Sequence, residues 1–381
     1  MKKMAIIGAS YLQLPLILKA QEKNIETHVF AWKAGDIGEK KADYFYPISI
    51  IEKEKILVKC LEIGIDGICS IASDLANITV NYVANKMNLI GNPPLCAERS
   101  TNKHKMRQCF DKHGDPSPKS IQVKTIDDLK NVKLEYPIIV KPIDRSGSRG
   151  ITKLDSEKGL RTAIERAKEQ GFQKYALVEE YVTGQEFSVE YISWKGQHTF
   201  VALTKKYTTG TPHFIETAHI EPVNMDEALL NTIKDVVSKA LTNLGILYGA
   251  SHSEIKISQK GSIKIIEIGS RMGGDCIGSS LVELSTGFDF VGAVIDIALG
   301  IKPQINIESN SIAAIRFVIS EKDIKILEQI KAEHPEILQE ENIWKDCGSE
   351  VTDSGSRFGY YIFTSKNPNL IERYLPKVNV Y

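Results

Sequence analysis

The segment 245–274 has the pattern of a β-hairpin with an acidic residue on each of two facing strands. Two short β-prone runs flank a Gln-Lys-Gly turn at 259–261, with Glu254 in the first run and Glu267 in the second. Like charges on paired strands destabilise a hairpin unless a cation lies between them, and carboxylates are ligands of divalent cations. Arg271 follows directly and can bind an anionic group. The segment therefore predicts a site for a nucleoside triphosphate with its magnesium ion.

The composition is that of a folded enzyme and argues against several classes of function. The chain has 381 residues, 42% hydrophobic and 25% charged, which is enough for two or three domains. Lysine plus arginine equals aspartate plus glutamate at 48 each, so the charge balance indicates neither a nucleic-acid nor a membrane partner. The six cysteines form no C-x-x-C pair, and the first apolar run is too short for a signal peptide. We expect a reduced, cytoplasmic protein.

The first 95 residues alternate apolar strand-like runs with helix-like segments, which predicts a doubly wound parallel sheet. Strands are expected at Met4–Ile7, Thr27–Ala31, Gly67–Ser70 and Leu89–Ile90, and helices at Leu12–Glu22, Glu52–Leu61 and Asp74–Lys86. Gly8 follows the first strand, but the G-x-G-x-x-G spacing is missing and no acidic residue closes the second strand. A nicotinamide cofactor is therefore not expected, although this loop can still face a substrate.

Two proline-containing segments divide the rest of the chain. Gly91-Asn92-Pro93-Pro94 indicates a boundary near residue 95, and Pro303 indicates a second one near residue 300. Strands are expected at 137–141, 176–180, 189–192, 200–204, 313–319 and 359–364, and helices at 103–113, 157–170, 226–244 and 323–332. We therefore expect an N-terminal α/β domain at 1–95, a core of two α+β lobes at 96–175 and 176–300, and a small C-terminal lobe at 301–381.

Lys141 ends an apolar strand and precedes a loop rich in serine and glycine at 144–150. A lysine at a strand end can reach phosphate oxygens as a point charge, and glycines let backbone N–H groups approach an anion closely. The loop residues nominated for this contact are Ser146, Gly147, Ser148 and Gly150. The loop fits no Walker pattern, so a solvated surface loop is the alternative.

Three further features have both a functional and a structural interpretation. Lys103 begins a basic helix, which taken alone is typical of a solvated helix face. At 179–186 an acidic strand end passes into a turn, where the backbone of 180–182 could bind an adenine edge and Glu186 the ribose hydroxyls. A plain acidic turn is the alternative there. His252 shares a strand face with Glu254 and is either a structural histidine or a substrate contact.

Together these segments resemble the ATP-grasp superfamily, in order along most of the chain. The resemblance implies that Lys103 and Lys141 contact phosphate and that loop 144–150 covers it. It implies an adenine hinge formed by Glu179, Glu180, Tyr181 and Val182, with Glu186 on the ribose. It also implies two metal carboxylates, Glu254 and Glu267, with Arg271 at the reacting phosphate or carboxylate. Residues 283–289 and 357–364 are similar to the biotin-carboxylase and carbamoyl-phosphate-synthase branch.

One position departs from the family pattern. Many members have a metal-binding asparagine two residues after the second glutamate, where this chain has Gly269. That coordination site must therefore go to water, phosphate or another residue. The motif Glu-Ile-Gly-x-Arg-x-Gly-Gly at 267–274 resembles that of L-amino-acid ligases and related carboxylate–amine ligases.

The resemblance implies an enzyme that uses ATP and magnesium, or manganese in its place, to join a small carboxylate to a small amine. An acyl phosphate would be the intermediate, with Arg271 and Lys141 as catalytic residues. Arg316 and His252 are nominated for substrate contact, and a homodimer is compatible with the family. The alternatives are a purine-pathway glycinamide-ribonucleotide enzyme, whose phosphate would need Arg316, Arg357 and Lys302 to converge, and a non-catalytic nucleotide-binding module.

Overall fold

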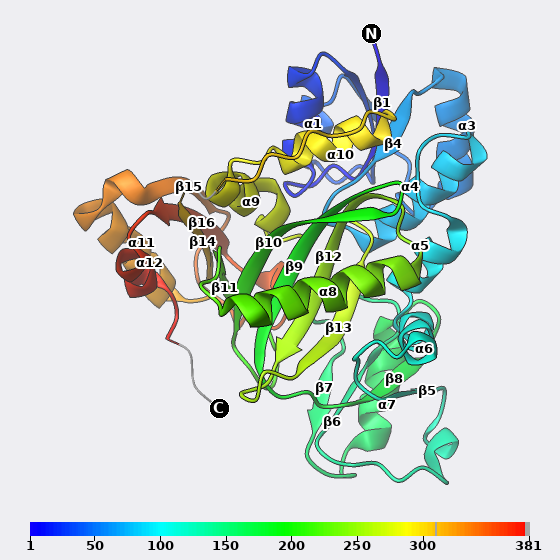
Figure 1. Ribbon diagram of the computed structural model, residues 1–381, viewed down its shortest axis with the longest axis vertical. Helices are drawn as coiled ribbons and strands as arrows, with labels where there is room; N and C mark the ends of the chain where they lie inside the picture. Colours follow the sequence, from blue (N-terminus) through cyan, green and yellow to red (C-terminus); the bar gives the residue numbers. More distant parts are fainter. Residues whose placement is uncertain (309–310, 378–381) are drawn as a thin grey trace.

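Three β-sheets organise the computed structural model, which describes residues 1–308 and 311–377 (Figure 1). The first sheet is parallel, has the order β3-β2-β1-β4, and is drawn in blue. Its elements are β1 (Lys3–Ile7), α1 (Leu14–Glu22), β2 (Glu26–Phe30), α2 (Ile37–Lys41), β3 (Tyr44–Tyr46), α3 (Lys53–Ile63), β4 (Gly67–Cys69) and α4 (Asp74–Lys86). The predicted parallel sheet is confirmed, and apolar side chains cover both of its faces.

The predicted strand at Leu89–Ile90 is wrong, because these residues close the end of α4. Asn88 takes a left-handed conformation with φ 55°, and the Leu89 N–H donates to the Ala84 carbonyl over 2.8 Å. This is the hydrogen bond of a helix C-terminal motif, in which the residue after the left-handed one packs back on the helix. Leu89 accordingly packs against the core cluster that contains Ala84. Leu89 and Ile90 therefore follow the end of a helix and form no strand.

The second sheet is four-stranded and antiparallel, with the order β5-β8-β6-β7. Its elements are β5 (Ser120–Val123), η1 (Ile126–Leu129), β6 (Ile138–Pro142), β7 (Thr152–Leu154), α7 (Leu160–Gln170) and β8 (Ala176–Glu180). Helices α5 (Pro94–Thr101) and α6 (Lys103–His113) connect it to the first sheet. One face of α7 is apolar and packs on the sheet through Ala163, Ile164 and Ala167, because these positions recur at helical spacing.

The third sheet is eight-stranded and antiparallel, with the order β13-β12-β9-β10-β11-β14-β16-β15. Its strands are β9 (Gln185–Trp194), β10 (Gln197–Thr208), β11 (Glu216–Glu221), β12 (Tyr248–Ile257), β13 (Ile263–Gly269), β14 (Ile312–Val318), β15 (Leu338–Ile343) and β16 (Gly359–Ser365). Its helices are α8 (Glu227–Leu244), η2 (Ile277–Leu281), α9 (Val282–Thr286), α10 (Phe290–Ala298), α11 (Glu321–Glu333), η3 (Pro335–Ile337), η4 (Ser354–Ser356) and α12 (Pro368–Tyr374). The predicted hairpin is confirmed as β12–β13.

Segments that are distant in the sequence share cores. Helix α10 packs against α1, and its apolar face belongs to the cluster that covers one side of the first sheet (Figure 1). Strands β14, β15 and β16 continue the sheet that begins with β9. The predicted boundaries near 95 and 300 remain predictions, but the packing across them holds the three sheets around one common region. No helix among the described residues is long and apolar enough to cross a membrane.

Candidate functional site

A cavity of about 400 Å³ lies where the three sheets meet. Nine of the residues nominated from the sequence line it: Lys103, Lys141, Ser146, Gly147, Ser148, His252, Glu254, Glu267 and Arg271. Gly269 lines it as well. The cavity is also lined by residues from the loop after β1, the start of α4, strands β10 and β11, and the 354–357 segment. The predicted phosphate and metal residues are therefore gathered in one place.

Glu254 and Glu267 face each other across the β12–β13 hairpin, as the pattern predicted. Each carboxylate has a lysine partner at 2.7 Å, Lys206 for Glu254 and Lys103 for Glu267. Burial alone would raise the pKa of Glu254, but Lys206 and His252 outweigh that effect and hold it well below its usual range. Glu254 is thus held as an anion on one side of the cavity, with Glu267 opposite it on the paired strand.

The carboxylates of the cavity fit a magnesium ion only if a bound phosphate compound supplies further oxygen ligands. Among residues 1–308 and 311–377, no group of three or more His, Cys, Asp or Glu side chains could hold a metal ion by itself. Magnesium commonly takes one or two carboxylates and completes its shell with phosphate oxygens and water. Two facing carboxylates beside a cluster of lysines match that requirement, so the site fits a metal that arrives with a polyphosphate.

Lys103 connects the hairpin to the serine-glycine loop. It starts α6 directly after the capping residue Asn102, and its side chain is almost fully buried. Besides binding Glu267, the Nζ atom donates to the carbonyl of Arg145 over 2.8 Å. Burial alone would lower the pKa of Lys103, but Glu267 outweighs it and raises the pKa. A single ammonium therefore joins the metal carboxylate to the loop expected to cover phosphate.

Three of the four nominated residues of the serine-glycine loop line the cavity, and the fourth does not. Gly147 and Ser148 both have a positive φ, of 74° and 59°, which turns the backbone sharply beside the cavity. The Ser148 hydroxyl donates to the carbonyl of Phe214 over 3.1 Å, so the loop contacts the segment before β11. Gly150 lies against Gln170 and Pro142 instead, where a Cβ atom would be crowded at 3.0 Å.

Glu179 is the first residue of the predicted adenine hinge, and its side chain has a role that the sequence did not indicate. Its carboxylate is buried and binds two cations, the Nε of Arg107 at 2.7 Å and the Nζ of Lys141. Burial lowers the pKa of Lys141, while Glu179 acts in the opposite direction. Arg107 also donates to the carbonyl of Ile266 over 2.6 Å, next to Glu267. The Glu179 side chain therefore positions Lys141, and the contact of the hinge backbone with adenine stays a prediction.

We expect Glu179→Gln to lower the free energy of unfolding by about 3–5 kcal/mol, because it leaves two buried cations without their counter-ion. The adjacent Glu180 is exposed and provides a matched control: Glu180→Gln should change the free energy of unfolding by no more than about 0.5 kcal/mol. Urea unfolding of both variants measures the difference. Equal stability of the two variants would contradict the counter-ion role.

The remaining hinge residues lie outside the cavity lining, and their contact with adenine stays a prediction. The Tyr181 ring has the ammonium groups of Lys153 and Lys256 at 4.9 Å and 5.5 Å from its centroid. Lys256 also donates to the carbonyl of Val182 over 3.4 Å. Glu186 lies 3.2 Å from Lys206 and so connects to the ammonium that binds Glu254. Glu186 and the predicted metal ligand Glu254 thus share one buried lysine.

His252 lines the cavity and is held between two carboxylates. Its Nδ1 bonds to Glu190, and its Nε2 lies 3.6 Å from Glu254. Burial alone would lower the pKa of His252, but Glu190 and Glu254 outweigh it and raise it to about 9. The imidazole is therefore a cation near neutral pH and suits charge stabilisation better than proton abstraction.

The comparisons with known proteins agree with this arrangement. A model described as the ATP-grasp domain matches residues 134–279, which include Lys141, the serine-glycine loop and the β12–β13 hairpin. The crystal structure of L-amino acid ligase from Bacillus licheniformis aligns with a TM-score of 0.84 and 23% identity, over 98% of this chain and 96% of that one. Residues 134–279 of this chain therefore match an ATP-grasp domain, as the sequence pattern predicted, and the whole chain shares its fold with that ligase.

Two curated ATP-grasp relatives match part of their length. Alanine–anticapsin ligase of Bacillus subtilis (strain 168) is 27% identical over 280 residues, which cover 64% of this chain and 58% of that protein. The carbamoyl phosphate synthase large chain of Caldanaerobacter subterraneus subsp. tengcongensis is 24% identical over 273 residues, or 68% of this chain and 24% of that protein. The matched region thus spans little more than half of the first relative.

The departure of Gly269 from the ATP-grasp pattern has a physical cause in this structure. Arg271 binds Asp74 of α4 through two hydrogen bonds, Nε to Oδ1 over 2.8 Å and the second guanidinium nitrogen to Oδ2 over 3.2 Å. A Cβ atom at Gly269 would lie 3.0 Å from the Asp74 Oδ1 and 3.2 Å from the Arg271 Nε. The ion pair therefore occupies the space that a side chain at 269 would need. Asp74 and Gly269 together fix Arg271 beside the metal carboxylates.

Arg316 is a structural residue and not a substrate contact of this ATP-grasp site. It lies on β14, where its guanidinium binds Asp323 at 2.8 Å and 3.0 Å and donates to the carbonyl of Tyr374. It does not line the cavity, and neither does the exposed Lys302. Of the three cations that a ribose 5-phosphate would need, only Arg357 reaches the cavity. The convergence that the purine-pathway alternative would need is therefore absent from the described residues.

Three charged residues that line the cavity were not nominated from the sequence. Lys206 of β10 is buried and has Glu186, Glu216 and Glu254 within 3.7 Å. Burial alone would lower its pKa, but these carboxylates raise it well above the usual value. The only sequence signal for Lys206 is that side chains alternate between the two faces of a strand, which places it on the same face as Thr204. Asp74 was predicted only as the first residue of a helix, and Asp275 was not nominated for any role.

Asp275 lines the cavity and lies 3.5 Å from the ring of His219. It has a left-handed backbone with φ 52° and binds Arg357 through two hydrogen bonds of 2.6 Å and 3.1 Å. Tyr11 and His219 also line the cavity. Burial lowers the pKa of His219, which leaves its ring neutral near pH 7, in contrast to His252. This part of the cavity is polar and holds a fixed ion pair.

Proposed function

We propose that this chain is an ATP-dependent ligase that joins a carboxylate to an amine through an acyl phosphate and releases ADP and phosphate. The observation that carries the proposal is the meeting of Lys103, Lys141 and Arg271 with the facing pair Glu254 and Glu267 in one cavity. The names of two relatives, alanine–anticapsin ligase and L-amino acid ligase, support amide formation. Those names describe those proteins, and the activity of this chain rests on its own site.

The charge of the cavity suits a polyphosphate and a carboxylate together. Eight cationic side chains line it, namely Lys103, Lys141, Arg145, Arg149, Lys206, His252, Arg271 and Arg357, taking His252 as protonated. Five acidic side chains line it, namely Asp74, Glu216, Glu254, Glu267 and Asp275. A concave site with an excess of one charge concentrates ligands of the opposite charge. A nucleoside triphosphate with its cation, beside a carboxylate, is such a ligand set.

The reaction needs alignment and charge neutralisation more than covalent work by the protein. A carboxylate oxygen of the acid attacks the γ-phosphorus, the bond from that phosphorus to the β–γ bridging oxygen breaks, and ADP leaves. The amine nitrogen then attacks the acyl carbon, loses a proton, and phosphate leaves with the former carboxylate oxygen. Lys103 and Lys141 hold the phosphates, and Arg271 stabilises the charge that develops on the acyl oxygen.

The facing carboxylates would hold the divalent cation in this scheme. A magnesium ion at Glu254 and Glu267 supplies charge neutralisation on the phosphate oxygens. The serine-glycine loop would exclude water, because water hydrolyses an acyl phosphate. The hydrogen bond from Lys103 to the carbonyl of Arg145 ties that loop to the metal carboxylate Glu267. Loop position and metal position are therefore mechanically connected.

Substrate-dependent phosphate release tests the proposal. Purified protein is incubated with ATP, magnesium and pairs of candidate carboxylic acids and amines, and the nucleotide products are separated. The proposal predicts ADP and phosphate only when an acid is present. AMP and pyrophosphate would show an adenylate route instead, and ATP binding without turnover for any pair would show a non-catalytic nucleotide-binding module.

Glu186→Ala tests the predicted ribose contact. Loss of a charged hydrogen-bond acceptor should raise the KM for ATP about tenfold and change kcat little, as expected for a binding contact. Glu216→Gln is a matched control, because Glu216 also lies near Lys206 but outside the hinge. Steady-state kinetics with varied ATP compares the two variants. An unchanged KM for Glu186→Ala, or an equal rise for Glu216→Gln, would contradict the ribose contact.

A further inference from the structure

A second cavity, of about 300 Å³, lies beside the main one, and we refer to it as the side cavity. It shares six lining residues with the main cavity: Asp74, Lys103, Arg145, Ser146, Arg149 and Glu267. Its remaining lining residues are Ile51, Leu75, Ile78, Thr101, Asp144, Phe172 and Gln173. The shared residues include the predicted phosphate lysine and metal carboxylate, so the side cavity opens at the reacting end of the site.

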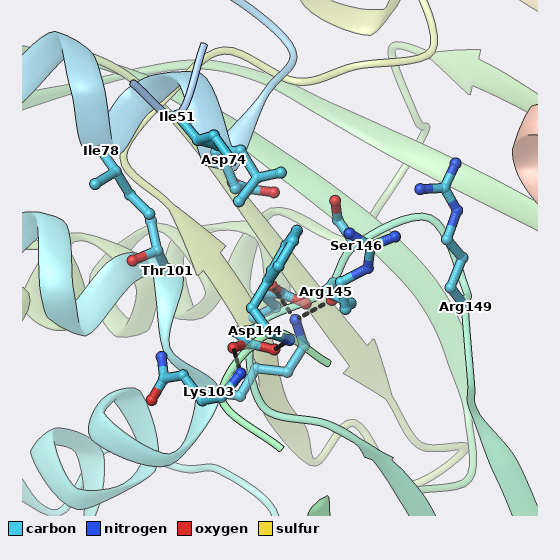
Figure 2. A pocket seen from close by; sticks show the side chains of 13 residues that line it. Ile51, Asp74, Ile78, Thr101, Lys103, Asp144, Arg145, Ser146 and Arg149 are labelled. Carbon is cyan, nitrogen blue, oxygen red and sulfur yellow. Dashed lines mark hydrogen bonds and ion pairs between the residues drawn. The ribbon is translucent and has the colours of Figure 1, made fainter. Parts of the chain in front are cut away.

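The wall of the side cavity away from that end is apolar. Ile51 and Ile78 come from the N-terminal unit, and Figure 2 shows them on the opposite side of the cavity from Arg145 and Ser146. Ile51, Ile78 and Phe172 are 53%, 37% and 51% exposed, although all three are large hydrophobic residues. Exposed apolar side chains gathered around one cavity are typical of a ligand site. The wall therefore suits the hydrocarbon part of a small molecule.

The acidic groups of the side cavity are already paired. Asp74 binds Arg271, and Glu267 binds Lys103. Asp144 accepts the backbone N–H groups of Phe172 and Gln173 over 3.0 Å and 2.8 Å. A cationic group on a ligand would have to displace one of these partners. The side cavity therefore does not favour an ammonium group on the side chain that enters it.

Its arginines, in contrast, have no acidic partner. Within residues 1–308 and 311–377, neither Arg145 nor Arg149 lies in an ion pair, and the Nε of Arg145 is buried without a hydrogen-bond partner. The Arg145 guanidinium lies over the Phe172 ring, 4.7 Å from its centroid. A cation held on an aromatic ring at the edge of an apolar wall binds an anion that carries a hydrocarbon part.

We propose that the side cavity binds the side chain of the acid substrate, and that this acid carries a branched aliphatic or aromatic group. The carboxylate then lies at the shared end, near Arg145 and within reach of the reacting phosphate, while the hydrocarbon part lies against Ile78 and Phe172. This inference rests on the proposed ligase function and assigns its substrate class. It also explains why the apolar residues of this wall remain exposed: the substrate covers them.

Hydroxamate formation tests the inference without knowledge of the amine. Hydroxylamine replaces the amine: its nitrogen attacks the acyl phosphate, phosphate leaves, and a hydroxamate forms. The probes are L-leucine, L-phenylalanine, L-alanine and L-aspartate, each with ATP and magnesium. We expect kcat/KM for L-leucine and L-phenylalanine to exceed that for L-alanine and L-aspartate at least about tenfold, because each buried methylene contributes strongly to selection.

Two variants locate the selection in the side cavity. Ile78→Asp places a charge in the apolar wall, and Phe172→Ala, on a separate loop, removes the ring under Arg145. Each should raise the KM for L-leucine about tenfold and leave the KM for ATP unchanged. The control is Val58→Asp on α3, a residue that is 57% exposed and lines neither cavity, and it should change neither constant.

The outcomes separate this inference from the proposed function. Hydroxamate formation at equal kcat/KM for all four acids, or variants that leave the KM for L-leucine unchanged, would overturn the side-cavity assignment while the ligase activity stands. No hydroxamate from any of the four acids would count against the acyl-phosphate route itself and against this substrate class. A kcat/KM about tenfold higher for L-leucine and L-phenylalanine in the wild type, with this preference lost in both variants, supports the assignment.

Discussion

Replacing Glu267 with glutamine should lower kcat about 10²–10³-fold, the loss typical of removing a group that stabilises charge in the transition state. Glu267 has two roles in the structure, since it faces Glu254 across the hairpin and binds Lys103 at 2.7 Å. The variant therefore loses half of the carboxylate pair and also releases the ammonium that ties the serine-glycine loop to the hairpin. Turnover and its magnesium dependence are measured together in an ADP-release assay.

The magnesium dependence separates the metal role from a loss of fold. If Glu267 holds the cation, the variant should need a higher magnesium concentration for half-maximal activity, and its free energy of unfolding should change far less than its rate. Glu328→Gln on α11 is a control, because that side chain is exposed and distant from the cavity. Activity within threefold of wild type in Glu267→Gln would exclude the metal assignment.

Gly269→Asn, the residue that many family members have at this position, should lower activity here about 100-fold instead of improving metal binding. A Cβ atom at 269 already lies 3.0 Å from Asp74 and 3.2 Å from Arg271, so the larger side chain must displace their ion pair. Arg271 would then lose the position from which it stabilises the acyl oxygen. The KM for ATP should change little, because neither Asp74 nor Arg271 belongs to the hinge.

Asp74→Asn and Gly274→Ala complete this test. Asp74→Asn removes the charge that holds Arg271 without adding bulk, so it should lower kcat, as Gly269→Asn does. Gly274 lines the same cavity, but a Cβ atom there meets only Ala72 at an ordinary 3.7 Å. Gly274→Ala should therefore keep kcat within about threefold. Full activity in Gly269→Asn would show that the Asp74–Arg271 pair has no role in catalysis.

The parts of the site that arise from local sequence were predictable. The β12–β13 hairpin follows from a turn between two β-prone runs, and its register places Glu254 opposite Glu267. The serine-glycine loop likewise follows from one strand end and its glycines. In both cases the residues that matter lie within about 25 positions of one another, so chain geometry alone determines their neighbours.

The counter-ions could not be predicted, because tertiary packing supplies them. Asp74 and Arg271 are 197 positions apart, and Glu179 and Arg107 are 72 apart. Their pairing depends on how α4 and α6 pack against the third sheet, which periodicity does not specify. Glu179 was nominated for the adenine hinge, but its role as the buried partner of two cations was not foreseen. Arg316 was nominated for its charge and is held by Asp323.

The fate of the carboxylate oxygen tests the central claim most directly. The acid that gives the fastest phosphate release is labelled with ¹⁸O in its carboxylate and turned over with ATP, magnesium and an amine. The acyl-phosphate route transfers one carboxylate oxygen to phosphorus, so the account predicts one ¹⁸O atom in the inorganic phosphate and none in the nucleotide. Unlabelled phosphate, or ¹⁸O in AMP, would contradict it.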